Sequence, residues 1–160
     1  MPVSQTSHDF DVQAAWTGAS TGPLSKDGFD RTYEISIDGK TAIRSSSAPS
    51  FGGDVSLINP EETLIAALVG CHMLSYLALA ARRGIDVRAY SDRATGTLGM
   101  KDGKMRMTKI VLRPRLEVGD ESEIEPAKVL HERAHQICFI ANSLAVEMVI
   151  EPEAAVAQSA

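Results

Sequence analysis

Cysteine is scarce in this 160-residue chain, and the two that are present, Cys71 and Cys138, limit what the protein can be. Two thiols are too few for a disulfide framework or for a zinc site built from cysteine alone. Positive charge is also in short supply, with 16 Lys and Arg against 21 Asp and Glu and a net charge of −5. Since a protein that binds a phosphate backbone normally carries a basic face, no nucleic-acid partner is expected.

Long apolar runs are absent with one exception, the stretch from Thr63 to Ala81. It is nearly long enough to span a bilayer. It includes Cys71 and His72, however, and it has acids before it and arginines after it. A helix that is apolar on all sides also occurs at the buried centre of a soluble fold, and this is the interpretation that we favour. No membrane partner is therefore expected.

The start of the chain, residues 1–13, has neither the basic region nor the apolar region of a secretory leader. Because thiols stay reduced in the cytoplasm, we expect a cytoplasmic protein. Apolar residues make up 44% of the chain and charged residues 23%, enough for a sizeable core. The length favours one domain over residues 1–160, with an Ala-rich tail after about residue 152 that is expected to fray.

Periodicity and turn signals predict an α+β fold. The asparagine at 59, the proline at 60 and two acids that follow indicate the start of a helix, and the glycine at 84 its end. Small polar residues over 45–58 predict a long loop that is a candidate for function. Strands are predicted over 10–17, 31–37, 86–98, 105–118 and 144–151, and helices over 60–83 and 125–140.

The cysteines allow three interpretations on residue pattern alone. Both can be inert packing, since free cysteine is often buried. They can instead form a redox pair. A metal site is the third possibility, because His131, His135 and Cys138 share one helix face and Cys71 could complete the set. That ligand spacing is uncommon on a single helix.

Two motifs resemble the OsmC/Ohr hydroperoxide-resistance family. The first is Asn-Pro-Glu-Glu at 59–62, followed by a small-residue helix into Gly-Cys-His-Met at 70–73. The second is Ala-His-Gln-Ile-Cys-Phe-Ile-Ala-Asn-Ser at 134–143, which is similar to the second cysteine helix of that family. The order of the elements and the length agree along nearly the whole chain. The resemblance therefore favours the redox interpretation over packing and metal binding.

The resemblance implies a thiol-dependent peroxidase that reduces organic hydroperoxides and, more weakly, hydrogen peroxide. Cys71 would be the peroxidatic thiol, Cys138 the resolving thiol that forms a disulfide with it, and Glu61 the carboxylate that positions an arginine. No cofactor or metal is implied, but an external reductant such as a lipoyl-type dithiol is needed. The implied assembly is an intertwined homodimer, in which antiparallel sheets wrap around a long central apolar helix.

The arginine that would activate Cys71 can be sought at two places. A thiol in mid-helix receives no help from the helix N-terminus, so a cation must stabilise the thiolate. In Ohr-like members this arginine precedes the glutamate by about thirty residues, which matches Arg31. In OsmC-like members it lies about ten residues before the glutamate, where this chain has Phe51-Gly52-Gly53. We take Arg31 as the candidate and Arg44 as the alternative.

Helix geometry gives a reason for the dimer. Glu61 and Cys71 would stand about 15 Å apart on one straight helix, so a second chain would have to bring the glutamate and its arginine to the sulfur. His72 is expected to pack, and an apolar peroxide pocket could include side chains at 51, 73, 76 and 139. Trp16 carries no functional signal. The alternative function is a non-catalytic dithiol protein that senses redox state or binds a small apolar ligand.

Overall fold

The computed structural model describes residues 7–18, 22–25 and 28–158. Much of the segment in which no leader is expected therefore lies outside the described residues. The chain forms two compact units, residues 1–62 and residues 63–160, and each is described by itself. The predicted α+β class is confirmed, because both units contain sheets and the second also contains long helices.

The first unit is built on a three-stranded antiparallel sheet in the order β1-β2-β3. The predicted strands over 10–17 and 31–37 are present but shorter, and a third strand, β3, joins them immediately before the loop. A short 3-10 turn, η1, interrupts the predicted loop. The bounds are β1 Gln13–Trp16, β2 Tyr33–Ser36, β3 Ile43–Ser45 and η1 Pro49–Phe51.

The long helix α1 covers Pro60–Arg83, as predicted. Asn59 Oδ1 accepts a hydrogen bond from the Glu62 backbone N–H at 2.9 Å, and the Glu62 carboxylate accepts one from the Asn59 N–H at 3.1 Å. This reciprocal capping box defines where the helix begins. Gly84, with φ of 71°, stands just beyond its end.

Only one narrow stripe of α1 is buried within the chain. The buried residues recur every four positions, at Leu68, His72, Tyr76 and Ala80. By length and composition α1 is apolar enough to cross a membrane, yet only 22% of its most apolar window is buried. Most of its apolar surface therefore lies outside the core of a single chain.

The second unit contains two three-stranded sheets, in the orders β4-β7-β9 and β5-β6-β8. Each of the two long predicted strands is divided between the sheets. The backbone N–H of Arg113 donates to the Asp92 carboxylate at 2.8 Å, and Pro114 has no N–H, so the ladder is interrupted between β6 and β7. The bounds are β4 Val87–Asp92, β5 Thr95–Lys101, β6 Lys104–Leu112, β7 Pro114–Val118, β8 Glu147–Ile150 and β9 Glu153–Val156.

Two strand pairs are parallel, which corrects the expectation of antiparallel sheets, while the other four described pairs are antiparallel as expected. β8 pairs with β6, and β9 pairs with β7, both in the parallel sense. The expectation of a frayed tail after residue 152 is wrong for β9, because the backbone of this strand bonds to β7. Both parallel strands follow the helical segment, which provides the crossover that parallel pairing needs.

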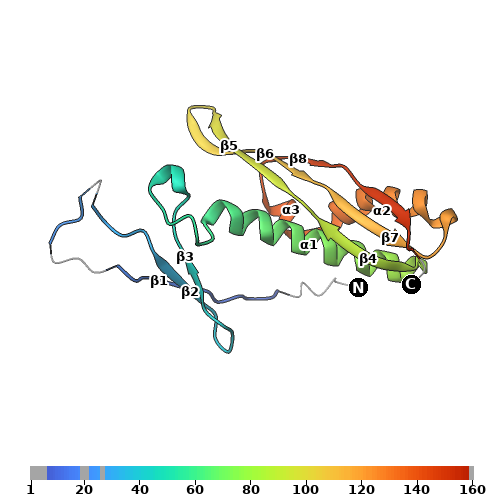
Figure 1. Ribbon diagram of the computed structural model, residues 1–160, viewed down its shortest axis with the longest axis horizontal. Coiled ribbons are helices and arrows are strands. Elements are labelled where there is room, and N and C mark those ends of the chain that lie inside the picture. The colour runs from blue at the N-terminus through green and yellow to red at the C-terminus, as the bar shows by residue number, and fades with distance from the viewer. Residues whose placement is uncertain (1–6, 19–21, 26–27, 159–160) are drawn as a thin grey trace. The chain divides into compact units, whose positions relative to one another are not determined.

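The second predicted helix is broken at its cysteine. α2 covers Ile124–Ile137, α3 covers Phe139–Ser143, and Cys138 between them has extended dihedral angles. A 3-10 turn, η2 (Glu121–Glu123), precedes α2. Figure 1 shows the long strands of this unit with α1 and α2 beside them. Two apolar clusters join the helices to the strands, one of Leu68, Ile110, Leu112, Cys138 and Ala141 and the other of Tyr76, Ala80, Leu116, Leu130 and Ala134.

Candidate functional site

The structure brings the two thiols together in the second unit. Cys138 is completely buried, and Cys71 is half-buried and packs against the same apolar cluster. Both are free thiols. Burial raises the pKa of Cys138 to about 11, and hydrogen bonding and charge interaction with the Cys71 thiol raise it further. The predicted pair is therefore in contact, with one accessible member and one shielded member.

The break between α2 and α3 holds the Cys138 sulfur in place. The Cys138 N–H donates to the His135 carbonyl at 3.3 Å, which closes α2. Cys138 then acts as the N-cap of α3, and its Sγ accepts a hydrogen bond from the Ala141 N–H at 3.4 Å. A cap residue points its side chain along the start of the next helix. The sulfur is thus oriented by backbone groups on both sides.

In the first unit, Arg31 lies among aromatic side chains. Its guanidinium carbon is 4.3 Å above the centre of the Phe29 ring, and its Nη1 donates to the Phe29 carbonyl at 3.3 Å. Arg31 lines a pocket of about 290 Å³. The other lining residues are Trp16, Phe29, Tyr33, Ser47, Phe51 and Pro60. A cation in an apolar pocket is a suitable place for a molecule that carries both an apolar group and a polar group.

Arg31 also lies beside Gly52. This glycine belongs to the loop segment at which the resemblance to OsmC-like members placed the alternative arginine. Gly52 has φ of 76°, and a Cβ built there would lie 3.2 Å from Arg31 Nη1. Position 52 in the loop and the Arg31 guanidinium therefore lie at one place in the first unit. Arg44, on β3, is exposed, and its charge lowers the pKa values of Asp30 and Asp54 after the larger effects of the hydrogen bonds that these carboxylates accept from Thr32 and Ser56.

Glu61 and Glu62 have different tasks although they are adjacent. The Glu62 carboxylate completes the capping box with Asn59. Glu61 is half-buried, and its Oε2 has no hydrogen-bond partner among the described residues. A buried carboxylate oxygen is expected to find a donor. Glu61 is therefore the acid that could hold a cation.

His72 and His131 form a buried pair, whereas His135 is only partly buried. His72 Nε2 lies 3.0 Å from His131 Nδ1, and the His131 ring stacks on Tyr76 with 4.2 Å between ring centres. Burial lowers the pKa of His72 to about 4 and that of His131 to about 3. The expectation that His72 packs is confirmed. Tyr76, proposed for a peroxide pocket, instead belongs to the core.

The other expected pocket residues are also dispersed. Phe51 does line an apolar pocket, the one around Arg31. Phe139 is 82% exposed. Within the described part of the chain, no three His, Cys, Asp or Glu side chains are arranged to hold a metal ion, so the metal interpretation of His131, His135 and the cysteines gains no support.

Sequence reasoning missed three aromatic residues of the Arg31 pocket. Phe29, Arg31 and Tyr33 alternate in the segment that leads into β2, and all three line the pocket. That period-two pattern was a usable signal. Trp16 lies opposite Tyr33 in the β1-β2 register, and only the strand pairing brings it there.

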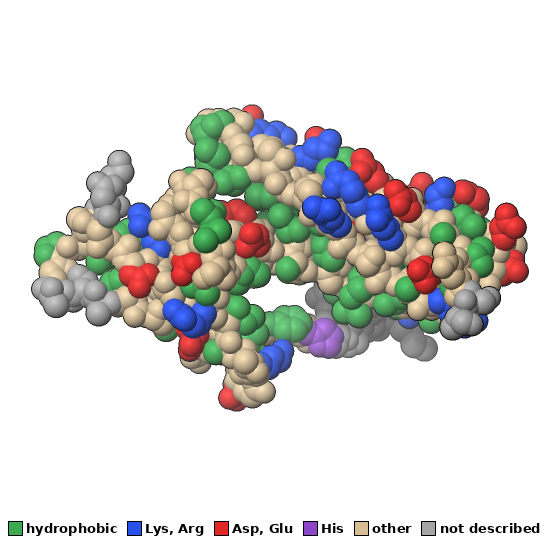
Figure 2. Space-filling view, in the orientation of Figure 1, with side chains coloured by type: hydrophobic (Ala, Val, Ile, Leu, Met, Phe, Trp, Pro, Cys, Tyr) green, Lys and Arg blue, Asp and Glu red, His purple; other side chains and the backbone are tan. Residues whose placement is uncertain are grey.

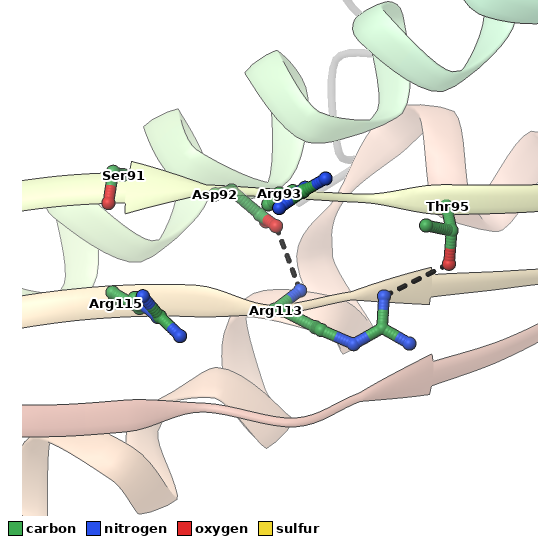
Figure 3. A pocket seen from close by; sticks show the side chains of 6 residues that line it. All are labelled: Ser91, Asp92, Arg93, Thr95, Arg113 and Arg115. Carbon is green, nitrogen blue, oxygen red and sulfur yellow. Dashed lines mark hydrogen bonds between the residues drawn. The ribbon is translucent and has the colours of Figure 1, made fainter.

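A second pocket, of about 520 Å³, lies on the strands of the second unit and is lined by Ser91, Asp92, Arg93, Thr95, Arg113 and Arg115. Figure 3 shows Arg113 extending toward Thr95, whose hydroxyl accepts its hydrogen bond at 3.0 Å. Arg113 and Arg115 also pair with Glu151 and Glu153 at 2.9 and 3.2 Å. Lys and Arg side chains gather over these strands with acids beside them (Figure 2), and their ion pairs brace the parallel strands.

Comparison with known proteins gives consistent results. Residues 52–153 match the family model described as OsmC-like protein. The uncharacterized protein YmaD of Bacillus subtilis (strain 168) is 22% identical over 153 residues, which cover 93% of this chain and 95% of YmaD.

Solved structures extend this similarity to the fold. An OsmC-like protein of unknown function from Vibrio cholerae is 31% identical, with a TM-score of 0.84 over 91% of this chain and 99% of that one. An organic hydroperoxide resistance protein from Elizabethkingia anophelis is 17% identical, with a TM-score of 0.69 over 94% of this chain and 100% of that one. At that identity the second likeness concerns the fold alone.

Proposed function

Because the chain belongs to the OsmC-like protein family, whose model matches residues 52–153, we propose that it is a thiol-dependent peroxidase. Its substrates would be organic hydroperoxides and, more weakly, hydrogen peroxide. The observation that carries this proposal is the contact between the half-buried Cys71 thiol and the buried Cys138 thiol. A similar fold in a protein named for organic hydroperoxide resistance adds support.

The proposed cycle has three steps. The Cys71 thiolate attacks the terminal peroxide oxygen, the O–O bond breaks, and the alkoxide leaves and takes up a proton to become the alcohol. Cys71 is then a sulfenic acid. Cys138 attacks its sulfur, a disulfide forms, and hydroxide leaves with the Cys138 proton as water. An external dithiol, for which we propose a lipoyl-type compound, reduces the disulfide through a mixed disulfide. No cofactor is proposed.

Arg31 is the proposed activating cation and Glu61 its proposed carboxylate partner. A guanidinium can bind a carboxylate with one edge and still present N–H groups to a thiolate. The aromatic pocket around Arg31 would hold the organic part of the peroxide, and the guanidinium would stabilise the departing alkoxide. Arg44 is disfavoured because its charge acts on Asp30 and Asp54.

We propose that the working assembly is a homodimer in which a second chain supplies Arg31 and Glu61 to Cys71. Glu61 and Cys71 are ten positions apart on α1, a rise of about 15 Å. A second copy would also cover the apolar surface of α1 that the chain leaves exposed. Sedimentation velocity at micromolar concentration tests this, and a monomer would overturn it.

Turnover of cumene hydroperoxide with a dithiol tests the function directly. Wild type should consume the peroxide, and Cys71→Ser should lose at least about 1,000-fold in rate, since the nucleophile is gone. Cys138→Ser should complete the first step only, leaving a trappable Cys71 sulfenic acid. No peroxide consumption by wild type, or full activity of Cys71→Ser, would exclude the enzyme and favour the non-catalytic dithiol alternative.

A further inference from the structure

The pocket of about 520 Å³ in the second unit lies where β4 passes into β5 and β6 passes into β7. We propose that this pocket binds a phosphate group, either as the free ion or as the end of a small phosphate ester. The proposal is independent of the peroxidase cycle, because no residue assigned to that cycle lines the pocket.

The lining of this pocket is polar and positively charged. Three arginines and one aspartate give it a net charge of +2, whereas the whole chain has a net charge of −5. The positive charge is therefore a local feature and not a property of the surface in general. The six lining residues, all polar or charged, are Ser91, Asp92, Arg93, Thr95, Arg113 and Arg115.

Two of the arginines are held by acids and still have donors for a ligand. Arg113 is paired with Glu151 through Nε at 2.9 Å, and Arg113 Nη1 donates to the Thr95 hydroxyl at 3.0 Å (Figure 3). Arg115 is paired with Glu153 through Nε at 3.2 Å. Neither glutamate lines the pocket, and no hydrogen bond within the described residues uses Arg113 Nη2 or either Nη of Arg115. Because the Thr95 hydroxyl accepts a bond from Arg113, its own proton is left to donate.

The third arginine and the aspartate complete the positive character of the pocket. Arg93 lies between β4 and β5, is exposed, and makes no ion pair or hydrogen bond with another residue that the structure describes. The Asp92 carboxylate is turned toward the protein, since its Oδ1 accepts the Arg113 backbone N–H at 2.8 Å and its Oδ2 is buried. A ligand in the pocket therefore faces guanidinium and hydroxyl groups.

This set of donors suits a phosphate group better than other ligands. Guanidinium groups bind phosphate oxygens with paired, charge-assisted hydrogen bonds, and hydroxyl groups can add to them. A phosphate group carries about −1.5 to −2 at pH 7, which matches the charge of the lining. A carboxylate has a single charge and fewer oxygens to share among these donors. A cation would be repelled by the three arginines.

Three probes test the ligand class: inorganic phosphate, glycerol phosphate and acetate, each at the same ionic strength set with sodium chloride. In the full-length protein, the backbone amide resonances of Ser91 and Thr95 should show a saturable shift with a phosphate probe. Acetate should bind at least about tenfold more weakly. The phosphate probe that binds more tightly identifies the source, free ion or ester. No saturable shift with either phosphate probe, or equally tight binding of acetate, would overturn the proposal.

Two arginine variants with the same change of net charge locate the site. Arg93→Gln removes a donor from the pocket, whereas Arg133→Gln removes an exposed arginine of α2 that does not line it. Phosphate binding should weaken about tenfold in the first and stay unchanged in the second. Equal effects in both would mean that general surface charge attracts the ion, and would overturn the proposal. Peroxide turnover by Arg93→Gln should match that of wild type, so failure of this site is distinguishable from failure of the proposed enzyme.

Discussion

The two units of the chain differ in what they bury. Residues 63–160 enclose two apolar clusters that join helices to strands. In the described part of residues 1–62, the buried residues are all polar: Thr32, Ser45, Ser46 and Asn59. Burial of apolar surface is the dominant stabilising contribution in folding, so the second unit has its own source of stability. The first unit keeps its aromatic side chains available for a ligand or a second chain.

The proposed chemistry divides along the same line. The second unit holds both thiols in or against an apolar core, where their positions are fixed by packing and by the break between α2 and α3. The first unit holds the candidate cation in an aromatic pocket. The second unit, which holds the thiols, and the first unit, which holds the candidate cation, can therefore be perturbed separately. Each experiment below affects one of them more than the other.

Acid should destabilise the second unit most. His72 and His131 have pKa values of about 4 and about 3 in the folded protein, against 6.5 for an ordinary histidine. As the pH falls below 6.5, the two histidines become protonated in the unfolded chain but stay neutral in the folded chain. The free energy of unfolding therefore falls between pH 6.5 and about pH 3. The loss should reach several kcal/mol, since each unit of pKa difference is worth about 1.4 kcal/mol.

Urea unfolding at a series of pH values measures this loss. His131→Phe keeps an aromatic ring in place and removes one titrating group, so its stability should depend less steeply on pH. A control, Asp9→Asn, changes an exposed charge of the first unit and should leave the slope of wild type unchanged. A slope for His131→Phe equal to that of wild type would show that the histidine pair is not the acid-sensitive element.

The next largest difference between the two units should be the loss of unfolding free energy when an apolar side chain is truncated. Leu112, on β6, is fully buried, and Leu112→Ala should lower the free energy of unfolding by about 2–5 kcal/mol through lost burial and a residual cavity. Ile43, on β3, is 49% exposed, and Ile43→Ala should lower it by less than about 1 kcal/mol. Circular dichroism in urea measures both. An equal loss for Ile43→Ala would mean that a second chain buries it.

Local signals account for the features that sequence predicted well. The asparagine cap, the proline after it and the glycine beyond Arg83 act within a few residues, and α1 has the predicted bounds. The third strand, β3, and the break at Cys138 were missed although both are local: β3 pairs with the adjacent strand β2, and hydrogen bonds within residues 135–141 hold the break. The parallel pairing of β8 and β9 was missed, because it depends on contacts between distant segments. The same holds for the site. Motifs identified both cysteines, but the approach of Arg31 to Gly52 appears only after the loop has folded back.

The approach of Arg31 to Gly52 suggests a third experiment, which tests the first unit. Arg31→Ala should lower kcat/KM for cumene hydroperoxide by about 100-fold, because a preorganised cation is lost from the site where charge develops. Arg44→Ala should change it less than about twofold, since a charge directed elsewhere contributes little. Steady-state kinetics under saturating dithiol measure both. A larger loss in Arg44→Ala would reverse the assignment.

A double variant tests whether an arginine at position 52 can replace Arg31. Combining Arg31→Ala with Gly52→Arg places the guanidinium on the loop, beside the space that Arg31 now occupies. About tenfold of the lost activity should return, with full recovery prevented because φ of 76° strains a residue that has a Cβ. Gly52→Arg alone is the control and should be no more active than wild type. Without any recovery, the two arginine positions would not be equivalent.

The smallest effect should come from the ion pairs along the parallel strands of the second unit. Lys109 pairs with Glu147 at 3.3 Å, directly opposite in the β6-β8 register, and both side chains are exposed. Lys109→Ala should lower the free energy of unfolding by less than about 1 kcal/mol, and 1 M salt should remove most of the difference. Glu147→Ala and the double variant complete a thermodynamic cycle in urea. A coupling energy above about 1 kcal/mol would mean that charge, and not only the apolar core beneath, determines where β8 pairs.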